Sequence, residues 1–285
     1  MWNRYQRAFI DFFEDQLVST RYNLDDLLEE YLFGGKEPLI NGLIAGRKYN
    51  SFAFEVVLLI IIVAHPLIHL GYAYELESKT VAIEALALGA CFYNPLHKYI
   101  DDPSYTKPHG GDGANADLYD ILDKVRHDTR FDGLYSSPNG DITKIFEQRE
   151  EALLEHWNAW PITDPTSQFE QAQSLAASLV LEKDDTGKFS FFFAHALTSS
   201  HAIRILLPLV PAKFHVSLIR QWWLFTLAVY VAQKRPVVKK TGGDETHDVN
   251  DKTWKHVVHN ALEGPHSKDA HYVKSKLSFS PFPGL

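Results

Sequence analysis

Residues 9–35 read FIDFFEDQLVSTRYNLDDLLEEYLFGG, and their spacing is that of helices. Between Phe9 and Leu17, apolar side chains recur at steps of three and four residues with charges between them. Asn23 then precedes LDDLLEEYLF as an N-cap, two aspartates occupy the first turn, and Gly34-Gly35 follows as a stop. The stretch therefore predicts two consecutive amphipathic helices.

Helical spacing continues along the rest of the chain. No alternating series of strands and no internal repeat competes with it. We therefore predict an all-α fold, a single irregular multi-helix domain over residues 1–285. Further helices are expected at 81–92, 118–125, 146–157, 169–181, 189–209, 218–231, 253–262 and 268–277, with long loops at 94–115 and 236–251.

Composition excludes several classes of protein. The 285 residues are 45% apolar and carry a net charge of −8 without a basic stripe, so we expect no nucleic-acid partner. The single cysteine, Cys91, excludes an internal disulfide or a cysteine-based zinc site and fits a reducing compartment. Acidic residues among the aromatics of the first twenty positions are wrong for a secretory signal. A cytoplasmic location is the expectation.

One apolar run raises a membrane alternative. Residues 56–73 read VVLLIIIVAHPLIHLGYA, which is close to the roughly 20 residues that a membrane helix needs. Pro66 and two histidines in its second half weaken that interpretation, because polar groups in lipid need partners. A buried element is favoured, and a membrane is not an expected partner.

Fourteen histidines is a high count, and four of them stand in apolar sequence. His65 and His69 lie in AHPLIHLGYAYE, and His195 and His201 lie in FFFAHALTSSHAIRILLP. An unpaired buried polar group costs ~1–3 kcal/mol, and a transition metal is one way to satisfy an imidazole. On spacing alone, ordinary core histidines bonded to backbone carbonyls or neighbouring hydroxyls remain the favoured interpretation. His195 and His201 are six residues apart and cannot share a helix face well.

Two other spacings are compatible with neighbouring side chains on a helix. His65 and His69 are four apart, although Pro66 disfavours the α conformation at His65 and predicts that this residue lies at a helix start. In KDAHYVKSKL, His271 and Lys274 are three apart. Taken alone, a lysine in that position is ordinarily a solvated charge.

Three blocks together resemble the fungal questin oxidase family. AHPLIHLGYAYELES at 64–78 is similar to its HPLIHLGYxLE block, and FFFAHALTSSHAIRILLP at 191–208 is similar to its central H-x-x-T-x-x-H-A-x-R-x-L-L-P block. RQWWLFTLAVYVAQKRP at 220–236 and DAHYVKSKL at 269–277 resemble its C-terminal W-W-x-x-x-x-A-x-Y and D-x-H-x-x-K elements. The blocks follow in the family's order.

The resemblance implies a mainly helical oxidoreductase of secondary metabolism. Its substrate would be an anthraquinone-like aromatic polyketide whose ring is opened by oxidation, either by Baeyer–Villiger-type insertion with NADPH or by non-haem-iron oxygenation. For the iron version, it implies a site of histidines plus a lysine that carries a carboxylate on its nitrogen. Carried over by position, the metal ligands are His65, His69, His195, His271 and Lys274, with His201 in reserve.

Fe(II) is the cofactor that we expect, and NADPH is the alternative. No G-x-G-x-x-G motif opens a strand-turn-helix unit, and Gly110-Gly111-Asp112-Gly113 stands in a polar loop. NADPH would therefore need another binding mode. The apolar residues 191–193 and Trp222-Trp223 are candidate walls for a flat substrate, although such residues are more often plain core.

The chain departs from that family in two places. Family members carry a further N-terminal region with histidines of its own, so the site here would be partial if a ligand lies there. Residues 46–63, GRKYNSFAFEVVLLIIIV, stand between two segments that are nearly adjacent in the family. We interpret these residues as an insert. Our hypothesis is that an error in the gene model produced both this insert and the position at which the chain starts.

Three other functions stay open from the sequence. A catalytically incomplete member would bind an aromatic metabolite without turnover. A helical metal-dependent hydrolase would need aspartates near the histidines, and neither histidine block contains one. A membrane-embedded helper protein would depend wholly on residues 56–73.

Overall fold

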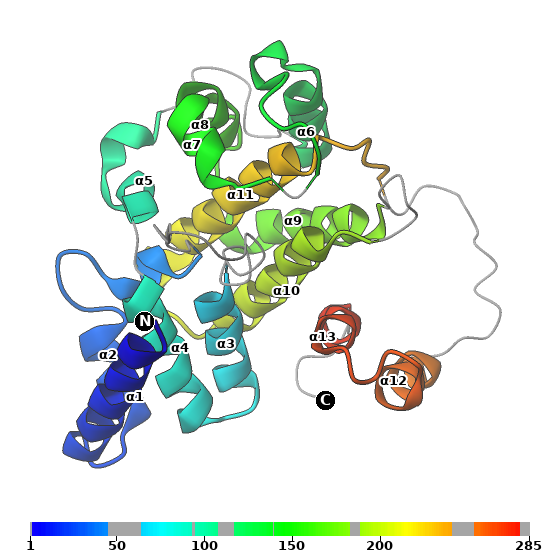
Figure 1. Ribbon diagram of the computed structural model, residues 1–285. Coiled ribbons are helices and arrows are strands. Elements are labelled where there is room, and N and C mark those ends of the chain that lie inside the picture. Colours follow the sequence, from blue (N-terminus) through cyan, green and yellow to red (C-terminus); the bar gives the residue numbers. More distant parts are fainter. Residues whose placement is uncertain are drawn as a thin grey trace.

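The computed structural model describes residues 2–44, 64–92, 95–107, 117–138, 140–182, 189–240 and 254–279. In these residues the chain forms α-helices and short 3₁₀ turns, with no strand, which confirms the all-α prediction (Figure 1). The α-helices are α1 (Trp2–Ser19), α2 (Leu24–Tyr31), α3 (His65–Glu75), α4 (Lys79–Phe92), α5 (Lys98–Asp101), α6 (Leu118–His127), α7 (Thr143–Gln148), α8 (Glu150–Asn158), α9 (Pro165–Leu181), α10 (Phe191–Leu206), α11 (His215–Ala232), α12 (Trp254–Glu263) and α13 (Ala270–Ser278).

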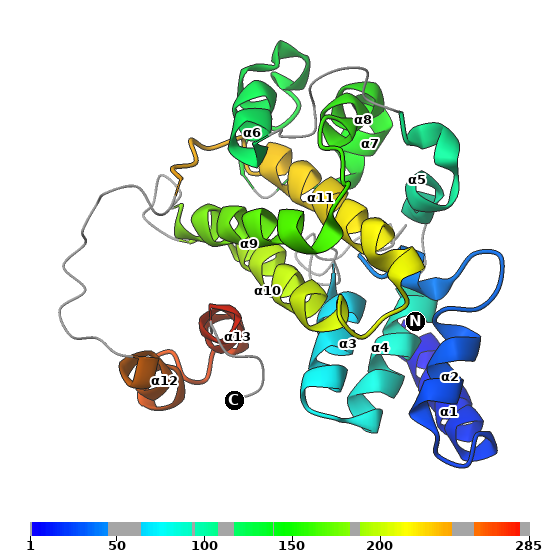
Figure 2. The same cartoon turned by 180° about the vertical axis from the view of Figure 1, so that it is seen from behind.

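Helix α10 occupies the centre of the molecule. It packs against α3, α9, α11 and α13, which come from both halves of the chain. Figures 1 and 2 show α1 to α4 on one side of α10, α5 to α8 beyond α11, and α12 with α13 on the opposite side from α1 and α2. Because thirteen of its sixteen residues are buried, α10 supplies both the core and the polar groups that lie within it.

The amphipathic pair at the N-terminus has the expected capping. The Asn23 side chain accepts a hydrogen bond from the Asp25 N–H at 3.1 Å, which satisfies one of the free donors at the start of α2. Leu27 and Leu28 are buried, and α1 packs along α4. A local sequence signal, the Asn23 cap, thus marks where α2 begins.

The α3–α10 crossing is unusually close at Gly71. A Cβ built on Gly71 would lie 2.6 Å from the Cβ of Ala202, which no folded chain tolerates without movement. A glycine opposite an alanine therefore lets the two backbones approach directly. This contact sets the spacing between the helices that carry three of the predicted ligands.

Gly71→Ala is expected to destabilise the protein by about 2 kcal/mol, because the new methyl group forces α3 and α10 apart. Gly89→Ala is the matched control, since the three atoms nearest to its Cβ would be leucine side-chain atoms at 3.2–3.3 Å and alanine has the better helix propensity. We expect this variant to stay within about 1 kcal/mol of the wild type. Urea unfolding measures both; equal losses for the two would contradict the interpretation.

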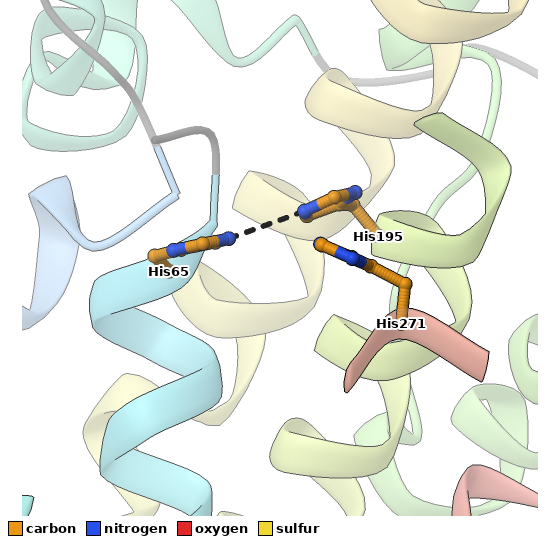
Figure 3. A group of neighbouring side chains, drawn as sticks. All are labelled: His65, His195 and His271. Atoms are coloured by element: carbon orange, nitrogen blue, oxygen red, sulfur yellow. Dashed lines mark hydrogen bonds between the residues drawn. The ribbon is translucent and has the colours of Figure 1, made fainter. Parts of the chain in front are cut away.

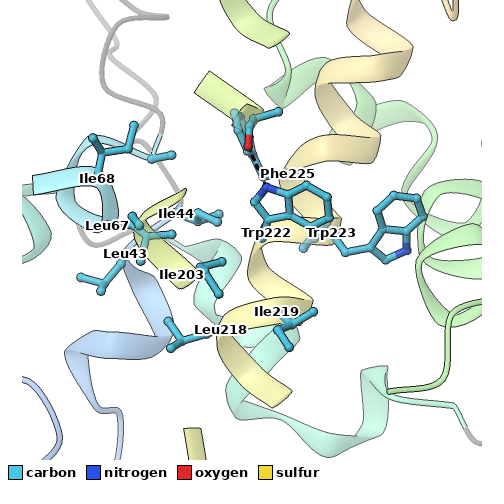
Figure 4. Packing of buried hydrophobic residues seen from close by; sticks show 14 of the residues in the cluster. Leu43, Ile44, Leu67, Ile68, Ile203, Leu218, Ile219, Trp222, Trp223 and Phe225 are labelled. Carbon is cyan, nitrogen blue, oxygen red and sulfur yellow. Dashed lines mark hydrogen bonds between the residues drawn. The ribbon is translucent and has the colours of Figure 1, made fainter. Parts of the chain in front are cut away.

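Two tryptophans join the central helices through their indole N–H groups. Trp222 on α11 donates to the Ala196 carbonyl of α10 at 2.9 Å, and Trp157 on α8 donates to the Arg220 carbonyl of α11 at 2.9 Å. Figure 4 shows Trp222 and Trp223 among the buried residues of this cluster. The Trp222 and Trp223 side chains are fully buried against other aromatic rings. They therefore belong to the core and do not form the substrate wall that the sequence suggested.

Two segments differ from the sequence-based expectation. The single helix expected at 146–157 is interrupted at Arg149, whose backbone leaves the helical region (φ −140°, ψ 28°) while its guanidinium donates to the Arg130 carbonyl. The loop expected at 94–115 contains short helical turns over 95–105. Short elements of this kind lack the length over which hydrophobic periodicity becomes visible.

The apolar run at 56–73 is described only from Ala64 onward. That part forms α3, most of whose residues are buried against the protein. Among the described residues, no helix is long and apolar enough to cross a membrane. The insert predicted at 46–63 and the glycine-rich segment at 110–113 lie outside the described residues.

Candidate metal centre

Three histidines that are far apart in the sequence converge beside α10. His65 comes from the start of α3, His195 from the first half of α10 and His271 from the start of α13. One nitrogen atom of each imidazole lies within 4.8 Å of the others, and Figure 3 shows the three rings turned toward a common point. His65 Nε2 and His195 Nε2 are 3.2 Å apart. The fold thus creates a group of nitrogen donors that no segment contains by itself.

His65 is the first residue of α3, as Pro66 predicts. Ala64 precedes it in the left-handed region (φ 67°, ψ 0°), and the proline takes the second helical position, where its missing N–H is not needed. The imidazole therefore projects from the end of the helix. From there it faces α10 across the interface.

The imidazole of His195 is held in one tautomer by its own helix. Its Nδ1–H donates to the Phe191 carbonyl one turn earlier at 2.8 Å, so Nε2 carries the lone pair. The 3.2 Å contact with His65 is then a hydrogen bond in which His65 Nε2–H donates to His195 Nε2. The expected bond to a backbone carbonyl is present at His195 Nδ1, whereas His195 Nε2 points toward His65.

His271 lies in the first turn of α13, next to the N-cap residue Asp269. Asp269 caps α13 by accepting from the backbone N–H groups of His271 and Tyr272, and its Oδ1 also lies 3.6 Å from His271 Nδ1. The opposite nitrogen, Nε2, is buried and has no hydrogen-bond partner among the described residues. A buried imidazole nitrogen without a partner is unfavourable by about 1–3 kcal/mol, which a metal ligand bond would relieve.

His69 and Lys274 stand around the triad. The His69 ring is 5.7 Å from the His65 ring, centroid to centroid, and its Nδ1 is 3.5 Å from Glu84 Oε2 of α4. The half-buried Lys274 ammonium lies close enough to lower the pKa of all four predicted histidine ligands. All five residues that the sequence predicted as ligands are therefore neighbours in space.

Burial keeps the imidazoles neutral. Removal from water is the main cause that lowers the pKa of His65 to about 3 and that of His195 to about 4. The Lys274 ammonium contributes to both shifts, while the bond to the Phe191 carbonyl opposes the shift at His195. Burial also lowers the pKa of the Lys274 ammonium, while the Glu84 carboxylate opposes that shift. Neutral imidazole is the form that binds metals.

The residues fit a transition metal. Three neutral imidazoles with convergent nitrogens, one of them otherwise unpartnered, match the donor set that iron, zinc or copper accept. Carbonyl or carboxylate oxygens lie on the Nδ1 side of His195, His271 and His69, an arrangement that favours metal binding through the opposite nitrogen of each ring. Without a metal, His271 Nε2 stays buried with no hydrogen-bond partner among the described residues.

His201, the reserve candidate, belongs to a separate buried cluster. Its Nε2 lies 3.1 Å from Glu75 Oε2, and Arg204 donates to its Nδ1 at 2.9 Å. Both ring nitrogens are thus engaged, and the His201 and Glu75 side chains are only 1% and 5% exposed. His201 is six residues from His195 and lies on a different face of α10. It therefore contacts Glu75 at the C-terminal end of α3 and not His65 at the start of α3.

Two acidic residues near the histidines had no role in the sequence-based interpretation. Glu75 ends α3 beside His201, and Glu84 lies beside His69. A signal for Glu84 exists, because it is the only charged residue from position 80 to 92, within an Ala/Leu-rich helix. An isolated carboxylate on an apolar helix indicates a partner elsewhere in the fold.

Comparison with known families identifies a match over most of the chain. The model of the family described as questin oxidase-like matches residues 2–276, which is nearly the whole chain. A search of curated proteins found no match.

Proposed function

The chain belongs to the questin oxidase-like family, which makes it an oxidase of polyketide metabolism, and from that premise we propose a specific reaction. The protein uses Fe(II) to cleave a ring of an anthraquinone-like aromatic polyketide with dioxygen, as a tailoring step in fungal secondary metabolism. His65, His69, His195, His271 and Lys274 hold the metal. The observation that carries the proposal is the convergence of His65, His195 and His271 within 4.8 Å.

Histidine nitrogen with an anionic oxygen is the ligand set of non-haem iron. When bound, iron supplies the activation of dioxygen that an organic side chain cannot provide. The protein's part is to keep the imidazoles neutral by burial and to fix their tautomers through their outer nitrogens. These features support iron over NADPH as the cofactor.

Lys274 supplies the anionic oxygen in this proposal. A deprotonated amine attacks carbon dioxide, an N–C bond forms, and a proton leaves to solvent, which converts a cation into a carboxylate. The lowered pKa of Lys274 increases the fraction of neutral amine that can react. The electrostatic effect of Lys274 on the pKa of four histidines supports this role, because it requires that its nitrogen lies near the proposed ligands.

An aromatic surface borders the histidines. The Phe191 ring lies 4.5 Å, centroid to centroid, from the rings of both His195 and His271. Phe191 is half-buried, unlike Phe192 and Phe193 behind it. A flat aromatic substrate stacked at this edge would be next to the proposed metal, which favours an aromatic substrate class.

The test begins with elemental analysis of protein purified without chelator. We expect near-stoichiometric iron, and oxygen consumption with an anthraquinone that ends after chelation and returns with Fe(II) but not with NADPH alone. Iron-loaded protein that binds the anthraquinone without consuming oxygen would favour the catalytically incomplete alternative. Activity that survives full metal removal would overturn the proposal.

A further inference from the structure

Glu84 is a carboxylate that lies beside the ligand cluster and has no role in the proposed site. It stands on α4, where its neighbours in sequence, Ile83 and Ala85, are buried. The residues one turn away, Thr80 and Leu88, are uncharged, so no ion pair within the helix explains a charge here. Its side chain is 44% exposed, which leaves the carboxylate free to adjust its position.

A buried nitrogen of His69 faces Glu84, whose carboxylate also lies near the Lys274 ammonium. Glu84 Oε2 lies 3.5 Å from His69 Nδ1, slightly beyond an ordinary hydrogen bond, and this nitrogen has no hydrogen-bond partner among the described residues. A small rotation of the half-exposed carboxylate would close the gap. Such contacts are often long before a site is filled and shorten when its ligand binds.

Two other histidines of the cluster follow the same arrangement. His195 Nδ1 donates to the Phe191 carbonyl at 2.8 Å, and His271 Nδ1 faces Asp269 Oδ1 at 3.6 Å. In each case an oxygen atom stands on the Nδ1 side of the ring, and at His195 its hydrogen bond leaves Nε2 unprotonated. His69 shows the same arrangement, and its acceptor Glu84 comes from α4, a fourth helix beside α3, α10 and α13.

We propose that Glu84 is a positioning residue that accepts the Nδ1–H of His69 and thereby presents the Nε2 lone pair of His69 to the metal. A carboxylate at one imidazole nitrogen holds the proton there, orients the ring and makes the other nitrogen a better donor. The metal role rests on the proposed function. The tautomer of His69 is independent of the proposed function, because His69 has a defined tautomer in the metal-free protein as well.

The first test is the tautomer of His69 in metal-free protein labelled with ¹⁵N-histidine. Two-bond ¹H–¹⁵N correlation, with His69 assigned by its loss in His69→Gln, is expected to show the proton on Nδ1. In Glu84→Ala we expect it to move to Nε2, whereas Glu77→Gln, a change of an exposed acid in the turn before α4, leaves it unchanged. A wild-type His69 protonated at Nε2, or no change in Glu84→Ala, would overturn the proposal.

The second test is metal affinity, measured by competition of Co²⁺ against a chelator. Glu84→Ala is expected to bind about 10–100-fold more weakly than the wild type, with an unchanged thermal midpoint of the metal-free protein. Equal Co²⁺ affinity in both would refute the positioning role while the proposed function stands. Absence of Co²⁺ and iron binding in the wild type would instead count against the proposed function, and the tautomer would still decide the role of Glu84.

Discussion

Replacing His195 with alanine is expected to weaken iron binding at least about a hundredfold and to abolish oxygen consumption with it. His195 is the ligand candidate with the most strictly determined geometry: it is buried, its Nδ1 is committed to the Phe191 carbonyl, and its Nε2 is 3.2 Å from His65. Removing it deletes the central nitrogen of the triad. Iron affinity is measured anaerobically by competition with a chelator.

His201→Ala is the matched control on the same helix. His201 is as buried as His195, but Glu75 and Arg204 occupy its nitrogens. We expect this variant to lose about 1–3 kcal/mol of stability, because two buried charged groups lose a partner, and to keep wild-type iron affinity. His201→Gln serves the same purpose if the alanine variant does not fold. Iron retained by His195→Ala and lost by His201→Ala would show that the ligands are wrongly assigned.

Lys274→Arg is expected to lower oxygen consumption by about 10–100-fold or more, although it keeps the positive charge. Arginine remains protonated in proteins and cannot take up carbon dioxide, so it cannot become an anionic oxygen ligand. Oxygen uptake measures the loss of activity. A ¹³C spectrum of zinc-loaded protein prepared in ¹³C-bicarbonate tests the cause, with an additional carbonyl signal expected in the wild type and absent in the variant.

Lys276→Arg provides the comparison for this result. Lys276 lies on the same helix as Lys274, but its ammonium stands over the Tyr272 ring, 5.4 Å from the centroid. It should keep both activity and the carbonyl signal. Full activity in Lys274→Arg would show that position 274 acts as a cation.

The helices were predictable because their signals are local. Apolar spacing, the Asn23 cap and the isolated prolines each act over a few residues, and the structure has helices where these signals are strong. The prediction was wrong at 146–157, where the helix breaks at Arg149, whose guanidinium donates to a carbonyl from a different part of the chain. Contacts of that kind leave no periodic trace in the sequence.

The candidate ligands were also visible before the structure, though for different reasons. His65, His69 and His195 attract notice as imidazoles in apolar runs, whereas His271 and Lys274 stand in a polar helix and were included only through the family resemblance. The outer carboxylate Glu84 was missed. Its partner His69 lies fifteen residues earlier across a turn, so only the packing of α3 on α4 brings the two together.

By itself, the sequence determined that this chain is helical, that it has several imidazoles placed where water cannot satisfy them, and that its blocks follow the order of one oxidase family. The tertiary structure alone decided which imidazoles meet. His65 and His195 are 130 residues apart, and their 3.2 Å contact depends on the close approach of α3 and α10 at Gly71 and Ala202. His201 is excluded by its place on α10 and its bond to Glu75. Helix formation depends on neighbours in the chain, but a ligand cluster depends on how those helices pack, and packing is a property of the whole fold.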